Sequence, residues 1–182
     1  MRKYVICLAL LMAFLLSGCG QLAAKLQPSE APVSTEAVDT LEDDKLYEAL
    51  LMRFMGANPK TLNPRQLTVA SIITFEAEMM NGGLCQFFVN DYSGLAQHVA
   101  AALAELEATQ LQALYTGFLS DNKIDLTQMD SFRISSIEDY EAKMEEYPYD
   151  PFDEAFYELY QTENLYERLI AFVRSHSEEI LT

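Results

Sequence analysis

Carboxylates are the commonest side chains in this sequence that could do chemistry, and they are densest near the C-terminus. Between residues 130 and 167 the chain has twelve acidic residues and two basic ones. In a helix over 136–147, Glu138, Glu141 and Glu145 share one face, because they are spaced i, i+3 and i+7. Paired carboxylates can hydrolyse glycosidic bonds, but acid pairs are unavoidable in a chain this acidic. A row of carboxylates pointing outward instead predicts binding to a basic surface.

Stability does not explain this row, since neighbouring like charges on a helix cost a few tenths of a kcal/mol per pair. Duplex DNA has one negative charge per about 1.7 Å of its axis, and carboxylates at helical spacing approximate that density sparsely. We therefore define a candidate acidic binding face, which comprises Glu138, Glu141, Glu145, Glu146, Asp150, Asp153, Glu154 and Glu158. The alternative is that an exported domain has net charge only to avoid aggregation.

A second distinctive stretch combines glycines, amides and adjacent aromatic residues. Its members are Glu78, Asn81, Gly82, Gly83, Gln86, Phe87, Phe88, Asn90, Ser93 and Gly94. Two helices are expected to meet here almost without a loop, because glycine permits a sharp turn and close backbone approach. The polar side chains can bond to groups at the helix ends that would otherwise lack partners. The functional alternative is a small polar pocket, floored by Phe87 and Phe88, for a small ligand or peptide.

Other catalytic and metal-binding patterns fail on inspection. The sequence contains no HExxH, no CxxC and no glycine-rich phosphate loop. Its two histidines, His98 and His176, are far apart, and Cys85 lies among apolar residues, which predicts a buried thiol. The segment 121–132 lacks the glycine and the final glutamate of a calcium loop. We therefore expect no enzymatic activity, no catalytic residue, no metal and no cofactor.

Helical periodicity of the apolar residues runs through most of the chain after residue 40. Asn63 and Pro64 have the residue types of an N-cap and a first helical position. The helix that follows them is apolar nearly all round, so it belongs in the centre of the core. Expected helices lie near 46–54, 64–80, 84–89, 95–106, 111–118, 136–147, 151–161 and 163–175, with a polar loop containing a short strand or turn at 120–135. These helices predict an all-α fold. We expect one compact domain of about six to eight helices.

The N-terminus has the pattern of an export signal. Two basic residues precede an apolar run from Val5 to Leu16, which is too short to span a membrane. The sequence Leu16-Ser17-Gly18-Cys19 resembles the lipobox of bacterial lipoproteins. That resemblance implies lipidation of Cys19 and removal of residues 1–18. Residues 19–40, which include two prolines and several serines and threonines, are expected to be a flexible linker, and residues 41–182 the folded domain.

The glycine-rich stretch also resembles the signature of the bacterial DNA-mimic protein domain. The shared pattern is an acid, Asn-Gly-Gly, an apolar residue, Gln-Phe-Phe, Asn and Ser-Gly, running from Glu78 to Gly94. The similarity extends over about 45–180, although Met80 and Leu84 replace an Asn and a Phe that are common in the family. The resemblance implies an all-helical fold, no catalytic residues and a carboxylate-rich surface that imitates DNA and occupies a DNA-binding protein.

Composition agrees with a basic partner. The chain has 28 acidic and 12 basic residues and a net charge of −16, which argues against direct nucleic-acid binding, since that depends on Lys and Arg. We expect a non-enzymatic protein-interaction module whose partner is a basic protein or peptide. It would be lipid-anchored in the bacterial cell envelope and face the extracytoplasmic side. A homodimer and a purely structural envelope role stay open.

Overall fold

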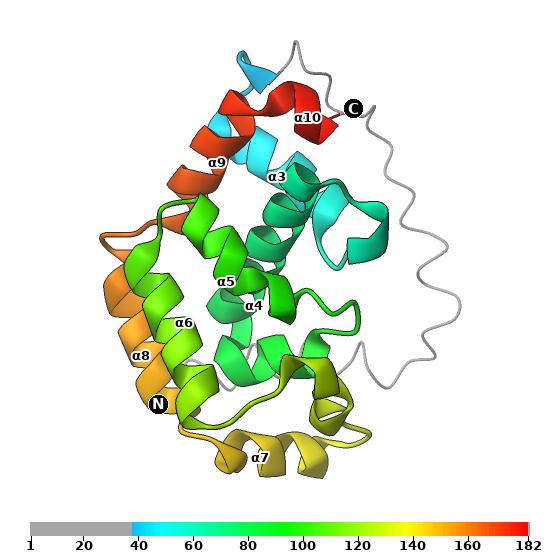
Figure 1. The fold of residues 1–182 in the computed structure, drawn as a ribbon, viewed down its shortest axis with the longest axis vertical. Helices are drawn as coiled ribbons and strands as arrows, with labels where there is room; N and C mark the ends of the chain where they lie inside the picture. Colours follow the sequence, from blue (N-terminus) through cyan, green and yellow to red (C-terminus); the bar gives the residue numbers. More distant parts are fainter. Residues whose placement is uncertain (1–37, 182) are drawn as a thin grey trace. The chain divides into compact units, whose positions relative to one another are not determined.

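The computed structural model describes residues 38–181, and this part of the chain is all-helical with no strand, which confirms the predicted fold class (Figure 1). The elements are α3 (Asp43–Phe54), η1 (Pro59–Thr61), α4 (Pro64–Asn90), α5 (Ala96–Glu105), α6 (Thr109–Asp121), η2 (Leu126–Phe132), α7 (Ile137–Glu146), α8 (Tyr149–Tyr160), α9 (Leu165–Ser175) and α10 (Ser177–Leu181). None of these helices is both long and apolar enough to cross a membrane.

The predicted signal segment 1–18 and the predicted lipidation site Cys19 lie outside the described residues. The end of the predicted linker 19–40 lies inside them. Val38 is fully buried in the core, because an isolated apolar side chain gains free energy by packing against the helices. The packed part of the chain therefore includes at least one residue of the segment that the sequence assigns to the linker.

Helix α4 lies at the centre of the fold, as its apolar pattern predicts. It contacts α3, α5, α7, α8, α9, α10 and η2. Its first turn has a reciprocal capping box: Asn63 Oδ1 accepts a hydrogen bond from Gln66 N at 2.9 Å, and Gln66 Oε1 accepts one from Asn63 N at 3.1 Å. Asn63 and Pro64 therefore occupy the N-cap and first helical positions that the sequence predicts.

Aromatic rings fill the space around the middle of α4. Phe75 makes edge-to-face contacts with Phe87 at 5.1 Å, Tyr115 at 5.5 Å and Phe156 at 5.6 Å between ring centroids. Edge-to-face pairs of this kind contribute about 0.5–1.5 kcal/mol beyond the burial of their area. Since these rings belong to α4, α6 and α8, they join three helices at one point.

Two segments differ from the sequence-based expectations. The predicted polar loop at 120–135 contains the 3₁₀ helix η2 and no strand, because Met129 and Phe132 turn inward and are buried. The short helix α10 after α9 was not predicted; its Ile180 is fully buried. Five residues are too few for a periodicity to be recognised, so tertiary packing decides this helix.

Two helices begin at a buried carboxylate instead of at a conventional capping side chain. Asp91 Oδ1 accepts hydrogen bonds from Gly94 N and Leu95 N, and its Oδ2 accepts one from Ala96 N, at 2.8–2.9 Å. In the same way, the Glu163 carboxylate accepts from the backbone N–H groups of Gln110 and Leu111 at the start of α6. A negative charge at a helix N-terminus satisfies unpaired N–H groups and opposes the positive end of the helix dipole.

Replacing Asp91 by alanine is expected to lower the free energy of unfolding by about 3 kcal/mol, because three backbone N–H groups at the start of α5 lose a charged acceptor. Urea unfolding followed by circular dichroism measures the change. The matched control is Asp125→Ala, which removes an exposed cap from η2 and is expected to cost less than about 1 kcal/mol. Equal losses in the two variants would contradict the assigned role of Asp91.

Candidate functional site

The glycine-rich motif forms a break inside α4. Gly82 (φ −158°, ψ 17°) and Gly83 (φ 78°, ψ −171°) have non-helical backbone angles, so the helix stops and begins again. The conformation of Gly83 is nearly exclusive to glycine. An interior break leaves carbonyl groups before it and N–H groups after it without helical partners. Those groups need acceptors and donors from water or from other parts of the chain.

On one side of the break, the carboxylate of Glu78 joins the two parts of α4. Its Oε2 accepts hydrogen bonds from Gln86 Nε2 at 2.7 Å and from Asn90 Nδ2 at 2.9 Å. A Cβ atom at Gly82 would lie 2.1 Å from Gln86 Oε1, so a larger residue would displace this amide. The acid, the glycine and the two amides therefore form one hydrogen-bonded unit across the break.

On the other side, α8 provides partners for both broken ends. Asp153 Oδ1 accepts a hydrogen bond from Leu84 N, just after the break, at 2.9 Å. Tyr157 OH donates to Met79 O, just before the break, at 2.7 Å. We call this pair, Asp153 and Tyr157, the α8 clamp. Its carboxylate lies so close to the backbone that a Cβ atom at Gly83 would be 2.0 Å from Asp153 Oδ2.

This geometry favours the structural interpretation of the motif over the ligand-pocket alternative. The amides of Gln86 and Asn90 are engaged by Glu78, and Phe87 and Phe88 are fully buried in the core instead of flooring a pocket. Asn81 is exposed. Ser93 and Gly94 serve the next helix, since both donate to Asp91 Oδ1. Cys85 is buried as predicted, and burial raises the pKa of its thiol to about 12.

The predicted carboxylate row on α7 faces outward. Tyr140 turns inward and is buried, while Glu138, Glu141 and Glu145 are exposed. Ile137 and Met144 share the side of the helix that includes Tyr140 but stay 42% and 48% exposed. Tyr140 is therefore the one buried residue of α7, and the acidic side of this helix is exposed.

The predicted acidic residues of α8 differ in exposure and in hydrogen bonding. Asp150, Glu154 and Glu158 are exposed, whereas Asp153 is half-buried in the α8 clamp and is removed from the candidate face by this geometry. Glu146 forms an ion pair with Lys143. We therefore use the name acidic face for the exposed carboxylates for which the described residues show no ion pair, namely Glu138, Glu141, Glu145, Asp150, Glu154 and Glu158.

Sequence reasoning missed a further buried carboxylate, Glu76. Its Oε2 accepts a hydrogen bond from Tyr47 OH at 3.0 Å, and its Oε1 accepts one from Tyr160 OH. Burial raises the pKa of Glu76, while the two phenol hydrogen bonds oppose that rise. The donors belong to α3 and α8, so no local pattern around Glu76 could have indicated them.

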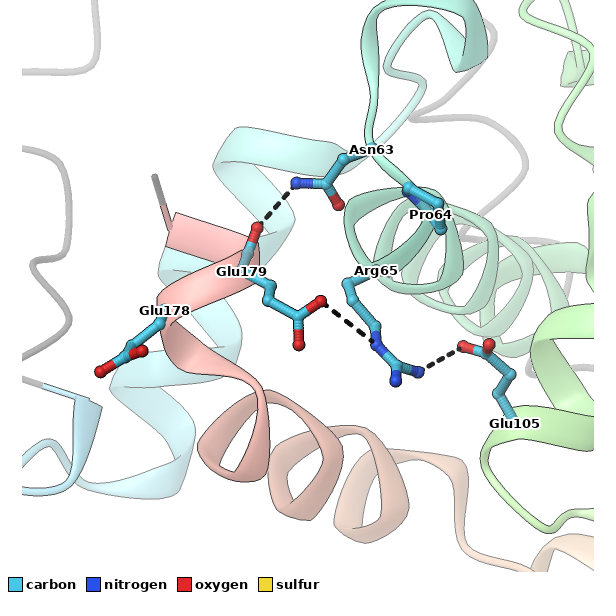
Figure 2. A pocket seen from close by; sticks show the side chains of 6 residues that line it. All are labelled: Asn63, Pro64, Arg65, Glu105, Glu178 and Glu179. Carbon is cyan, nitrogen blue, oxygen red and sulfur yellow. Dashed lines mark hydrogen bonds and ion pairs between the residues drawn. The ribbon is translucent and has the colours of Figure 1, made fainter.

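A hollow of about 780 Å³ lies away from both the motif and the acidic face, between the start of α4 and α10 (Figure 2). Arg65 extends across it and pairs with Glu105 at 3.4 Å and Glu179 at 3.8 Å. Asn63 Nδ2 donates to Glu179 O at 2.7 Å. The polar side chains joined by dashed lines in Figure 2 are therefore engaged with one another across the hollow. In residues 38–181, no group of three or more His, Cys, Asp or Glu side chains is placed to hold a metal ion.

Comparison with known proteins gives one match. A family model described as "DMP19-like protein" matches residues 60–176. The matched segment contains the break in α4, the α8 clamp and the acidic face of α7 and α8. No curated protein and no solved structure matches the chain.

Replacing Gly83 by alanine is expected to destabilise the protein by at least about 2 kcal/mol more than replacing Gly56. Both glycines have positive φ, but the new Cβ at Gly56 would have no atom within 4 Å, whereas at Gly83 it would meet Asp153. Thermal unfolding of the two variants measures the difference. In an Asp153→Ala background the excess cost of Gly83→Ala should shrink, and an unchanged excess would argue against the contact.

Proposed function

The chain belongs to the DMP19-like protein family, and we propose that it is a non-enzymatic DNA-mimic protein whose acidic face occupies a basic partner. The observation that carries the proposal is the set of exposed carboxylates on α7 and α8 that have no ion pair among the described residues. A partner that binds DNA presents Lys and Arg side chains to phosphates, and the same side chains can pair with these carboxylates.

The spacing of the carboxylates supports this reading. Asp150, Glu154 and Glu158 are four residues apart on α8, which places successive side chains about 6 Å apart along one side of the helix. One strand of duplex DNA has a phosphate per about 3.4 Å of axis. The density of negative charge along α8 is therefore lower than along DNA. Its charges nevertheless have the same sign as phosphates and follow one straight element.

The contrast with other surface acids also supports the proposal. Asp43, Glu105 and Glu179 pair with arginines of neighbouring elements, so their charge is partly balanced within the domain. The acidic face lacks such partners in the part of the chain that the structure describes. Its like charges repel one another and slightly oppose folding, and binding of a cationic surface would relieve that repulsion.

The cellular location predicted from the N-terminal sequence restricts the class of partner. Transcription factors and nucleoid proteins are cytoplasmic, whereas a protein lipidated at Cys19 would face away from the cytoplasm. We therefore propose a cationic envelope protein, a cationic peptide or a secreted nucleic-acid-binding toxin as the partner class. Any of these would be held by Coulombic attraction, which salt screens over about 10 Å at 0.1 M ionic strength.

Exchanging three carboxylates of the acidic face for amides tests the proposal. The variant Glu138→Gln/Glu141→Gln/Glu145→Gln is expected to retain at least about tenfold less basic protein than the wild type in affinity capture from envelope extracts, because binding scales with the number of paired charges. Captured protein is measured by quantitative mass spectrometry. High salt and added duplex DNA should both displace the partner.

The matched control is Asp39→Asn/Glu42→Gln/Glu178→Gln, which removes the same charge from exposed residues outside α7 and α8. It should bind as the wild type does. If the α7 variant also binds as the wild type does, or if duplex DNA does not compete, the acidic face is not a DNA mimic.

Cys19→Ser is expected to abolish incorporation of a labelled fatty acid and to release the protein from the membrane fraction, since stable anchoring depends on acyl chains. The readouts are gel fluorescence after labelling with an alkyne fatty acid and fractionation of the cells. The control Cys85→Ala changes a buried thiol and should leave both readouts intact. Labelling that persists in the Cys19→Ser protein would refute anchoring at this residue.

A further inference from the structure

The α8 clamp places a carboxylate against a helix break without a cation beside it. Asp153 Oδ1 is bound to Leu84 N, and Asp153 Oδ2 lies against the backbone of Gly83. The six ion pairs of the described residues do not include Asp153. An ionised carboxylate that is withdrawn from water and has one backbone donor is poorly compensated.

The groups that face Asp153 do not supply a balancing positive charge. Its own helix brings Asp150, and α4 brings Cys85. Tyr149 interacts with Cys85, and Glu78 acts on Tyr140. From α7 come Tyr140 and, farther away beside Cys85, Lys143 with its ion-pair partner Glu146. The titratable residues of α6, which packs on another side of α8, are Tyr115, bound to Ala96 O, and the exposed Asp121. The charge that acts on Asp153 is thus that of another carboxylate, Asp150.

We propose that the α8 clamp is a proton-sensitive latch, in which protonation of Asp153 tightens α8 against the break in α4 and ionisation loosens it. The latch has two parts at i and i+4 of one helix. The Asp153 carboxyl group responds to pH, and the Tyr157 hydroxyl donates a hydrogen bond to Met79 O. Because α8 also bears Asp150, Glu154 and Glu158, the latch sets how firmly part of the acidic face is held.

The direction follows from proton linkage. Burial raises the pKa of Asp153 from 3.8 to about 6, with the hydrogen bond from Leu84 N opposing that rise and the charge of Asp150 adding to it. The closed latch therefore binds a proton more tightly than an open one, in which the carboxyl group is solvated. Stabilisation of the closed latch is fully present below pH 4 and is lost as the pH rises through 6.

Hydrogen exchange at the Leu84 amide measures how often its hydrogen bond to Asp153 opens. After correction for the intrinsic exchange rate, its protection factor in the wild-type protein is expected to fall by up to about tenfold between pH 5 and pH 7.5. In Asp153→Asn, where the side chain cannot ionise but still offers an oxygen to Leu84 N, the protection should not vary with pH. NMR spectroscopy of the labelled protein measures both.

Two variants separate the latch from general effects of charge and packing. Asp150→Asn removes the neighbouring exposed acid and should keep the pH dependence, with its midpoint shifted slightly toward lower pH. Tyr157→Phe should lower protection at every pH and keep the slope. A flat profile in the wild type, or an unchanged slope in Asp153→Asn, would overturn the proposal.

A measurement on the wild-type protein keeps the test independent of any variant that fails to fold. The ¹³C shift of the Asp153 carboxyl group titrates with its protonation. A midpoint near pH 6 supports the latch, and a midpoint near pH 4 contradicts it. None of these readouts involves a partner, so the latch and the acidic face succeed or fail separately.

Discussion

The break in α4 is the feature on which the rest of the fold depends. Interrupting a helix leaves backbone carbonyl and N–H groups without helical partners, and each needs another partner. Glu78 joins the two parts of α4 from one side through Gln86 and Asn90, while Asp153 and Tyr157 bind the broken ends from α8. Helix α8 is therefore held by hydrogen bonds of fixed direction as well as by apolar contact. That docking fixes which of its carboxylates face solvent.

The acidic residues of this protein fall into two groups, buried ones that accept hydrogen bonds and exposed ones. Glu76, Glu78, Asp91 and Glu163 are buried and accept hydrogen bonds from phenols, amides or backbone N–H groups. These donors stabilise the four carboxyl groups, and none of the four pairs with a described cation. The remaining acids of the described residues are mostly exposed. The net charge alone thus overstates the number of acidic side chains at the surface.

One helix connects the fold with the proposed function. Asp153 and Tyr157 of α8 bind the break, and the same helix contributes three carboxylates to the acidic face. Asp153 and Glu154 are adjacent in sequence yet differ in exposure and in role. Because α8 binds the break through Asp153 and Tyr157, a change in the break would also shift the exposed carboxylates of α8. The charge pattern and the core are in this sense one structural unit.

The sequence by itself determined the fold class, the start of α4 at Asn63, the central place of that helix, its break at the two glycines and the outward row on α7. All of these follow from local periodicity, capping chemistry and glycine geometry. The sequence could not determine that Asp153 binds the break or that Asp91 and Glu163 cap helices. It also could not determine that Glu76 accepts hydrogen bonds from two tyrosine hydroxyl groups. Those roles depend on donors brought from other elements, and a carboxylate looks the same in sequence whether its neighbours in space are water or an N–H group. Only the tertiary structure decided which acids bind donors within the fold and which remain exposed.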